Sequence, residues 1–493
     1  MAIETITATP ISVPRIRVRR GAIPLGLAAL GFVVSFAGSW IPSLWGDEAA
    51  SVLSAERPLP SLFAMLTRID AVHGTYYLLL HQWVAVFGAS ELSVRLPSAL
   101  AAGAAVAGTY FVARRLTTRR VAILAGIVCA VLPRMTYIGE EARGYALATA
   151  IATWLTVLLL ELVDRRTTSR LAWVAYAVLL AVGIYVFLYL FLVAIAHGVY
   201  VAISHRSRIR RWLVATAAGL AAAAPVAIFG FLERHQVAFI KNRPVTAGEV
   251  LVTQWFDNPW LAGACWALIV AAVIAAVRSR RAGVVTLALP WLIVPTLALL
   301  SASVLIIPTY TLRYVSLSTP AAAILVAAGL ALLRPQAVLI AGLGLLVALA
   351  APSYVAQRTD YAKGAGSDWR QASALIASEA HPGDAVLFDN SVRASRKPRL
   401  ALRMYPDDYR GLVDVELAVP FGESPGLWDQ TTPLAQNATK LTGVSTVWLL
   451  TRAGSTDDVN GNDLHELIAL GFSLQHKTHV HTTNIYELTR PLP

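Results

Sequence analysis

The chain has 493 residues, of which 56% are hydrophobic and only 14% are charged. A mean hydropathy of +0.60 excludes an ordinary water-soluble globular protein and is typical of an integral membrane protein. The 41 Lys and Arg outnumber the 29 Asp and Glu, but they fall in short clusters between apolar runs. This pattern orients a membrane protein and argues against a nucleic-acid-binding protein.

Eleven apolar runs come close to the length of about 20 residues that a transmembrane helix needs. The first run follows a cluster of four arginines at residues 15–20, and no small-residue cleavage site comes after it. We therefore expect an uncleaved first helix with its N-terminus in the cytoplasm. The predicted spans lie near residues 22–40, 96–113, 121–138, 144–163, 171–187, 188–203, 212–232, 259–277, 284–307, 315–333 and 336–352.

Charge alternates between the connections that join these runs. Arginines gather near residues 114–120, 165–170, 206–211, 278–281 and 334. The connections in between hold the carboxylates of Asp47, Glu48, Glu56, Asp70, Glu140, Glu141, Glu233, Glu249 and Asp257. Because cytoplasmic loops are enriched in Arg and Lys, we expect the acidic connections on the outer face. An odd number of spans then places everything after Pro352 outside.

The first external connection, residues 41–95, is long. Its apolar stretch from Tyr76 to Phe87 is too short to span a bilayer, so we interpret it as a helix in the membrane interface. Residues 1–352 are thus predicted to form a mainly α, polytopic transmembrane domain. The charged residues 353–493 are predicted to form a soluble α/β domain outside the cytoplasm. In it we expect helices at 368–379 and 463–470 and strands at 385–388, 444–450 and 478–488.

Two adjacent carboxylates, Asp47 and Glu48, come directly after the first predicted span. Charged groups at such a position are costly unless they face water or a partner, and apolar surroundings can tune an Asp that accepts a proton. An alternative is that Asp47 only caps a helix that starts near Glu48.

A second cluster, Glu140-Glu141-Ala142-Arg143-Gly144-Tyr145, lies at another predicted external boundary, as do Arg95 and Arg313-Tyr314. Arginine side chains bind phosphate oxygens bidentately, and carboxylates suit a divalent metal or an attacking hydroxyl. Ion pairs among these groups would explain the same residues without any chemistry.

The stretch from Gly46 to Tyr145 contains GDEAAS, HGTYYLLLHQWVAVFGASELSVRLPSAL, RRLTTRR and EEARGYAL, in this order. It resembles the C-type glycosyltransferase superfamily, in particular the group of protein O-mannosyltransferases and the lipid A aminoarabinose transferase. The resemblance covers the first third of the chain and extends more loosely to Arg313-Tyr314 and Asp368-Trp369-Arg370. Two motifs differ from the family pattern: HPP is His73-Gly74-Thr75 here, and SQEAR is Gly139-Glu140-Glu141-Ala142-Arg143.

The resemblance implies a polyprenyl-phosphate-linked sugar as donor and a catalytic Asp in the first external loop, the position of Asp47. It implies that Asp47 takes a proton from the acceptor hydroxyl and that the anomeric carbon is inverted. We further expect a divalent cation, Mg²⁺ or Mn²⁺, held by Glu48 and Glu141, and no nucleotide or redox cofactor. The implied substrate-binding residues are Glu48, His73, Tyr76, Arg95, Glu141, Arg143, Tyr145, Arg313 and Tyr314.

The sequence thus predicts a multi-pass glycosyltransferase of the plasma (inner) membrane, with mannose as the expected sugar and an envelope glycan or glycolipid as acceptor. Arabinosyl transfer stays open as an alternative. A transporter or flippase for an envelope lipid would use the same arginines without making a bond, although the two halves of the chain show no convincing repeat of the kind transporters often have. A structural assembly subunit would tolerate the loss of Asp47.

Overall fold

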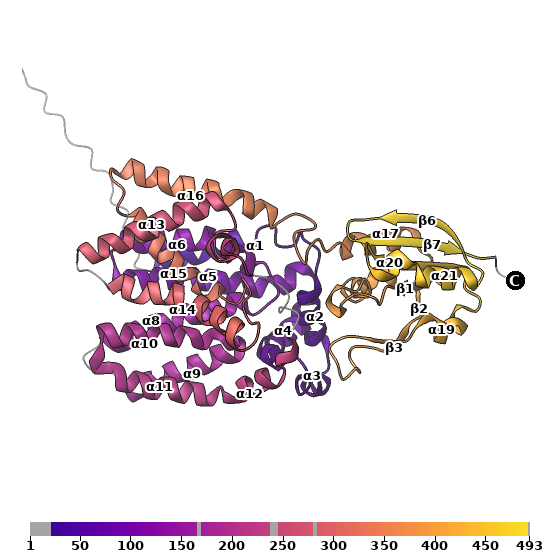
Figure 1. Ribbon diagram of the computed structural model, residues 1–493, viewed down its shortest axis with the longest axis horizontal. Helices are drawn as coiled ribbons and strands as arrows, with labels where there is room; N and C mark the ends of the chain where they lie inside the picture. The colour runs from indigo at the N-terminus through magenta and orange to yellow at the C-terminus, as the bar shows by residue number, and fades with distance from the viewer. Residues whose placement is uncertain (1–20, 165–168, 237–244, 280–282, 492–493) are drawn as a thin grey trace, which may run out of the picture.

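The computed structural model describes residues 21–164, 169–236, 245–279 and 283–491. A bundle of helices makes up one end of the molecule, and a smaller α/β region makes up the other (Figure 1). The arginines at positions 15–20, on which the predicted cytoplasmic N-terminus depends, lie outside the described residues.

Helices occupy all eleven predicted apolar runs. They are α1 (Ala22–Phe36), α5 (Glu91–Leu116), α6 (Arg119–Val131), α7 (Pro133–Gly139), α8 (Tyr145–Asp164), α9 (Arg170–Val186), α10 (Phe191–Ser204), α11 (Ile209–Ala222), α12 (Ala224–Leu232), α13 (Pro259–Arg278), α14 (Gly283–Leu305), α15 (Thr319–Leu330) and α16 (Gln336–Ala356).

The predicted class, a mainly helical multi-pass membrane protein, is confirmed, but the count of eleven spans is not. Among the described residues, five helices are long and apolar enough to cross a membrane, or seven if two bent pairs each form one span. The pairs bend by 59° between α6 and α7 and by 52° before α12. Pro133 and Pro225 lie at these breaks, and a proline lacks the N–H that would continue the helical hydrogen bonds. Other runs form apolar helices of fewer than 18 residues.

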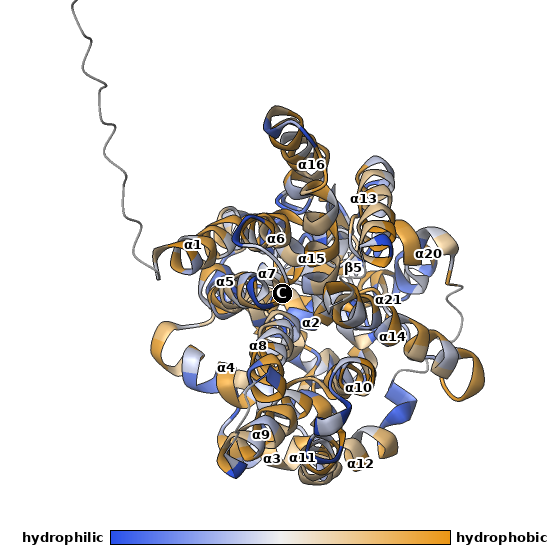
Figure 2. Ribbon diagram, turned by 90° about the vertical axis from the view of Figure 1, so that its left-hand side faces the viewer, coloured by the Kyte–Doolittle hydropathy of each residue, from blue (hydrophilic) through white to orange (hydrophobic). Residues whose placement is uncertain are grey.

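Small residues allow the helices of the bundle to pack closely. A Cβ at Gly103 of α5 would lie 2.6 Å from the carbonyl oxygen of Ala28 in α1, and one at Gly329 of α15 would collide with the backbone of Leu268 in α13. Close backbone approach at small residues is a common way for helices to associate in lipid. Hydrophobic residues are frequent along the helices of the bundle (Figure 2), and some of their side chains are exposed, such as Val178 of α9, Val270 of α13 and Ile340 of α16, which suits contact with lipid.

The first predicted external loop lies between the bundle and the α/β region (Figure 1). It contains α2 (Gly46–Glu56), α3 (Leu59–Leu66), the short 3-10 helix η1 (Ala71–His73) and α4 (Gly74–Phe87). The helix predicted from Tyr76 to Phe87 is therefore present as α4. Its Tyr77 and Leu80 are buried in a core that also includes Leu53 of α2.

The α/β region is built on one five-stranded sheet in the order β2-β1-β5-β7-β6. Strand β1 is parallel to β2 and β5, whereas β7 is antiparallel to β5 and β6. A second sheet pairs β3 with β4. The elements are α17 (Trp369–Glu379), β1 (Ala385–Phe388), η7 (Ala394–Arg396), α18 (Arg399–Met404), β2 (Val413–Asp414), β3 (Leu417–Val419), β4 (Gln430–Thr431), α19 (Leu434–Asn437), β5 (Thr446–Arg452), α20 (Thr456–Asn460), α21 (Asn462–Ala469), β6 (Ser473–His479) and β7 (Thr483–Thr489).

One predicted strand is wrong in extent. Residues 478–488, expected as one strand, are the end of β6, a turn and most of β7. The turn is held by Asp368, whose carboxylate accepts backbone N–H bonds from His481 at 3.1 Å, Thr482 at 2.6 Å and Thr483 at 2.9 Å. These partners lie more than 100 residues away, so the alternation of side chains alone could not reveal the turn.

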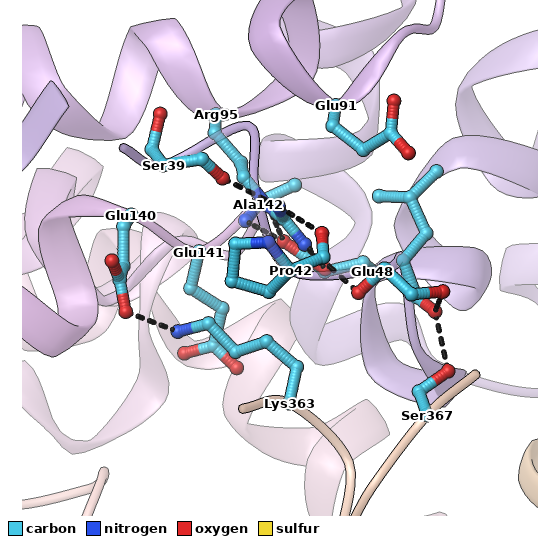
Figure 3. A network of polar contacts seen from close by, with 12 residues as sticks. Ser39, Pro42, Glu48, Glu91, Arg95, Glu140, Glu141, Ala142, Lys363 and Ser367 are labelled. Atoms are coloured by element: carbon cyan, nitrogen blue, oxygen red, sulfur yellow. Dashed lines mark hydrogen bonds and ion pairs between the residues drawn. The ribbon is translucent and has the colours of Figure 1, made fainter. Parts of the chain in front are cut away.

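Ion pairs join the α/β region and the segment before it to the bundle, and the two pairs made by Glu140 are buried. Lys363 Nζ lies 2.9 Å from Glu140 Oε1 (Figure 3), and Arg358 Nη1 lies 3.2 Å from Glu140 Oε2. Arg370, in the first turn of α17, pairs with Glu91 at 2.6 Å. Apolar residues of α2 and α4 share one core with Trp369, Phe388 and Leu400. The α/β region is thus packed directly against the first loop.

Candidate active site

A cavity of about 730 Å³ lies where the bundle, the first loop and the α/β region meet. Among the described residues, its lining includes six arginines but only three carboxylates, those of Asp47, Asp70 and Asp257. An enclosed surface with such an excess of positive charge attracts anionic ligands. The arginines are Arg134, Arg143, Arg313, Arg393, Arg396 and Arg452.

Asp47 stands in the first turn of α2, and its side chain is 28% exposed. The N-cap of this helix is Trp45, without a side-chain capping bond, so Asp47 does not cap it. Oδ2 of Asp47 accepts a 2.5 Å hydrogen bond from Nη1 of Arg313, whereas Oδ1 accepts none from the described residues. The Asp47 carboxylate therefore has one oxygen fixed and one available to a ligand in the cavity.

Electrostatics keep Asp47 ionised. Burial favours the neutral acid, but the charges of Arg313 and Arg143 outweigh it and hold the pKa of the Asp47 carboxyl below its usual value. An ionised carboxylate with a free oxygen is what a general base needs.

Arg313 is held from several sides. Besides Asp47, its Nη1 donates to Oε1 of Glu141 at 3.1 Å, and its guanidinium lies 5.1 Å from the ring centre of Trp45 and 5.6 Å from that of Tyr145. Glu141 is fully buried, and its Oε2 has no hydrogen-bond partner among the described residues. Burial raises the pKa of Glu141 although Arg313 opposes the rise.

Arg143 organises the opposite side of Asp47. Its Nη1 lies 3.3 Å from both the carbonyl oxygen of Asp47 and the hydroxyl of Ser51, and its Nη2 lies 3.0 Å from Nε2 of His73. Burial and the charge of Arg143 lower the pKa of His73 to about 4, so the imidazole is neutral at physiological pH. His73 can therefore accept a hydrogen bond from Arg143.

Glu48 and Arg95 form a fully buried ion pair (Figure 3), and neither of them lines the cavity. Arg95 Nε and Nη2 lie 2.7 and 2.5 Å from the two oxygens of Glu48, and Glu48 Oε1 also accepts the backbone N–H of Ala142 at 2.9 Å. Nη1 of Arg95 donates to the carbonyls of Ser39 and Pro42. This pair ties α2, α5 and the loop that carries Arg143 to one another.

The same contacts bear on the predicted metal. Both oxygens of Glu48 are engaged by Arg95 and Ala142, and Asp47 and Glu141 already share the cation of Arg313, so these side chains do not fit a divalent ion bound between Glu48 and Glu141. Within the described ranges, no group of three or more His, Cys, Asp or Glu side chains is placed to hold a metal ion.

The ten residues predicted for the site therefore divide into two layers. Asp47, His73, Arg143, Tyr145, Arg313 and Tyr314 line the cavity. Glu48, Tyr76, Arg95 and Glu141 are buried and are absent from its lining. Several lining residues were not predicted for the site: Trp45, Asp70, Tyr137, Trp369, Arg393, Arg396 and Arg452. The family resemblance reached Trp369 without giving it a role, and only charge could have pointed to Asp70 and the three arginines.

An apolar groove of about 560 Å³ opens near this cavity. Gly230 of α12 lies between the two: a Cβ there would be 2.9 Å from Val72, which lines the cavity, and 3.1 Å from Leu188, which lines the groove. Tyr189, which follows Leu188 of the groove, packs with its ring centre 5.1 Å from that of Tyr314, which lines the cavity. The lining is Ile184, Leu188, Phe191, Leu220, Ala223, Ala224, Ala227, Ile228, Phe231 and Leu232, all apolar.

Known proteins were compared with this chain by sequence family and by fold. Residues 75–229 match the family model described as dolichyl-phosphate-mannose-protein mannosyltransferase. The fold is similar to that of ArnT from Cupriavidus metallidurans bound to undecaprenyl phosphate, with a TM-score of 0.56 and 14% identity over 94% of this chain and 97% of that one. The chain has the fold of a C-type glycosyltransferase.

Other comparisons agree with this fold. The apo state of the same ArnT matches with a TM-score of 0.53 and 14% identity, again over 94% of this chain and 97% of the other. The C-type fold also appears in the archaeal oligosaccharyltransferase AglB from Archaeoglobus fulgidus, in complex with an inhibitory peptide and a dolichol-phosphate. Its TM-score is 0.50 at 11% identity, over 87% of this chain and 69% of that one. No curated protein matches by sequence. The family-model match and the similar folds confirm the predicted resemblance to the C-type glycosyltransferases.

Proposed function

We propose that this protein transfers a sugar from a polyprenyl-phosphate donor to an acceptor hydroxyl, with inversion at the anomeric carbon and Asp47 as general base. The observation that carries the proposal is that the Asp47 carboxylate pairs with Arg313 and lies beside Arg143, which donates to the Asp47 backbone carbonyl, in one cavity. A proton acceptor with a free oxygen thus stands beside two cations that suit a phosphate leaving group.

The reaction is a single displacement. The acceptor oxygen attacks the anomeric carbon and forms the new glycosidic bond, while Oδ1 of Asp47 takes its proton. The bond between the anomeric carbon and the phosphate oxygen breaks, and its electron pair leaves with the polyprenyl phosphate. Arg313 and Arg143 stabilise the charge that grows on that phosphate. In this step Glu48 stays paired with Arg95 and has no chemical role.

The lipid part of the donor requires an apolar surface at the depth of the bilayer. The groove lined by α9, η2 (Leu188–Leu190), α10, α11 and α12 offers one, and Gly230 borders both the groove and the cavity. In this arrangement the prenyl tail lies in the groove and the phosphate reaches Arg313 and Arg143. Undecaprenyl phosphate bound to ArnT, which has a similar fold, supports this class of donor.

We propose mannose as the sugar, because the family model that matches residues 75–229 describes a mannosyltransferase. Aminoarabinose is the rival sugar, since the fold is also similar to that of ArnT. We propose that the protein lies in the plasma membrane with the cavity and the α/β region outside the cytoplasm. The reason is that the arginine-rich connections, which favour the cytoplasmic side, alternate with the acidic ones. The proposed acceptor is a glycan or glycolipid of the cell envelope.

The test is transfer of radiolabelled sugar from polyprenyl-phosphate mannose, and in parallel from the aminoarabinose donor, into envelope lipids by membranes that contain the protein. Asp47→Asn should lower transfer at least about 100-fold, because the amide cannot accept the proton. Asp407→Asn is the matched control, since Asp407 is an exposed carboxylate of the α/β region that pairs with Arg410.

Equal transfer by wild type and Asp47→Asn, at equal amounts of inserted protein, would refute the role of Asp47. No transfer from either donor, with polyprenyl lipid moved across the bilayer instead, would replace glycosyl transfer by the flippase alternative.

A further inference from the structure

The carboxyl end of β5 and the segment that follows β1 form part of the cavity wall. These parallel strands are neighbours, but the chain leaves β1 toward β2 on one side and leaves β5 toward β6 and β7 on the other. In open α/β sheets, ligands bind in the crevice where such connections diverge. Arg452 ends β5 at this point, and the segment after β1 carries Arg396.

The segment after β1 packs against the start of α2, the helix that carries Asp47. The backbone of Ser395 lies so close to Gly46 that a Cβ at Gly46 would collide with the Ser395 carbonyl oxygen. Gly46 immediately precedes Asp47. The loop that carries Arg396 is thus fixed beside the proposed base, although about 350 residues separate them in the chain.

Arg396 and Arg452 are cations without a committed partner. No carboxylate in the described parts of the chain lies within ion-pair distance of either guanidinium, and neither side chain donates a hydrogen bond to those parts. The two acids that act electrostatically on Arg452 are engaged by other groups: Asp368 accepts bonds from the turn before β7, and Asp389 accepts them from Ser391 and from the backbone of Arg452. Burial, and then the charge of Arg396, lower the pKa of Arg452.

The other arginines of the cavity contrast with this pair. Arg313 is bound to Asp47 and Glu141, and Arg134 donates to the carbonyls of Gln254 and Thr253. Arg396 is exposed and Arg452 is half-buried. Their like charges repel each other in the cavity, and an anion bound between them would offset this repulsion. Guanidinium groups bind phosphate and carboxylate oxygens bidentately.

We propose that Arg396 and Arg452 bind an anionic group, a phosphate or a carboxylate, of the acceptor. This inference rests on the proposed function, because it assumes that the donor phosphate occupies Arg313 and Arg143. The donor is tethered at bilayer depth by its prenyl tail, whereas the acceptor reaches the cavity beneath the α/β region. Binding of its anionic group at this wall would present a nearby hydroxyl to Oδ1 of Asp47.

The experiment is arginine footprinting with phenylglyoxal on the full-length protein in nanodiscs, read residue by residue by mass spectrometry. The anionic probe is a short-chain phosphatidic acid, and the neutral probe is the matching short-chain diacylglycerol. Phosphatidic acid should slow the modification of Arg396 and Arg452 about tenfold, because guanidinium groups that are hydrogen-bonded to the phosphate are shielded from the reagent. Diacylglycerol should have no effect, and Arg410, which is exposed and paired with Asp407, is the internal control.

A second arm separates the two phosphate sources. With undecaprenyl phosphate already bound, phosphatidic acid should still protect Arg396 and Arg452. Protection of this pair by undecaprenyl phosphate alone would assign it to the donor and overturn the proposal, as would equal rates with and without phosphatidic acid. The footprint requires no transfer, so its outcome is independent of the Asp47 experiment.

A kinetic measurement then tests the role of the pair in transfer. Arg396→Gln with Arg452→Gln should raise the KM for the acceptor about tenfold and leave the KM for the donor unchanged. A rise in the KM for the donor would contradict the assignment to the acceptor. Arg410→Gln is the control variant for charge loss in the same region.

Discussion

At the scale of single residues, the pair of Asp47 and Arg313 combines two demands that oppose each other. A base must be ionised, which Arg313 promotes, but a strong salt bridge also makes a carboxylate a weaker proton acceptor. The arrival of a donor phosphate changes this balance, because its oxygens compete with Asp47 for the same guanidinium. The proposed base would thus become more basic when the donor is in place.

Replacement of Arg313 by Gln tests this coupling through the pH dependence of transfer. Burial raises the pKa of Asp47 and Arg313 opposes it, so the substitution should raise that pKa. Since only the ionised carboxylate accepts the proton, the acid limb of kcat/KM should move to higher pH. The measurement is the pH profile of transfer for wild type and Arg313→Gln.

The same experiment in a Glu141→Gln background excludes Glu141, which also contacts Arg313, as the titrating group. An acid limb that stays at the same pH with and without the Arg313→Gln substitution would show that Asp47 does not control it.

The sequence predicted which residues lie in or near the site better than it predicted which of them line the cavity. Asp47 and Glu48 are adjacent, and successive residues on a helix point about 100° apart. Asp47 therefore faces the cavity while Glu48 points into the protein toward Arg95. The motif could not reveal this division, because the start of α2 had to be known to within one residue.

At the scale of elements, the apolar runs located the helices well, since burial in lipid or in the bundle demands apolar side chains over the whole length. The runs could not show where a helix bends, and the breaks at Pro133 and Pro225 reduce the number of straight helices long enough to span. The strand predicted at residues 385–388 is confirmed as β1, whereas the β6–β7 turn depends on the distant Asp368.

The buried pair of Glu48 and Arg95 should matter for stability more than for chemistry. Glu48→Gln leaves the Arg95 guanidinium buried without its counter-charge, which typically costs about 3–5 kcal/mol. The expected result is a lower midpoint of thermal unfolding in detergent. The control is Glu161→Gln, because Glu161 pairs with Arg115 at a partly exposed position, where a pair contributes about 1 kcal/mol or less. Equal midpoints for the two variants would contradict a stabilising role of the buried pair.

At the scale of the whole molecule, the cavity is complete only because the α/β region closes it. Trp369, Arg393, Arg396, Trp428 and Arg452 line the same space as Asp47. The sequence predicted that this region exists and has an α/β fold, but it could not place these side chains, because they lie more than 300 residues from Asp47 in the chain. Local periodicity carries no information about such a contact.

Gly46 offers the sharpest test of this closure, because it is the point where the loop of Ser395 lies on α2. Gly46→Ala would push the Ser395 carbonyl away and, with it, the loop that carries Arg396. We expect transfer to fall by about tenfold or more, while alanine keeps α2 helical, as it is the best helix former. Gly422→Ala is the matched control, because a Cβ there meets no atom within 4 Å. Wild-type transfer by Gly46→Ala would show that the α/β region does not need this close contact to complete the site. A loss of transfer together with faster phenylglyoxal modification of Arg396 would show that the loop has moved.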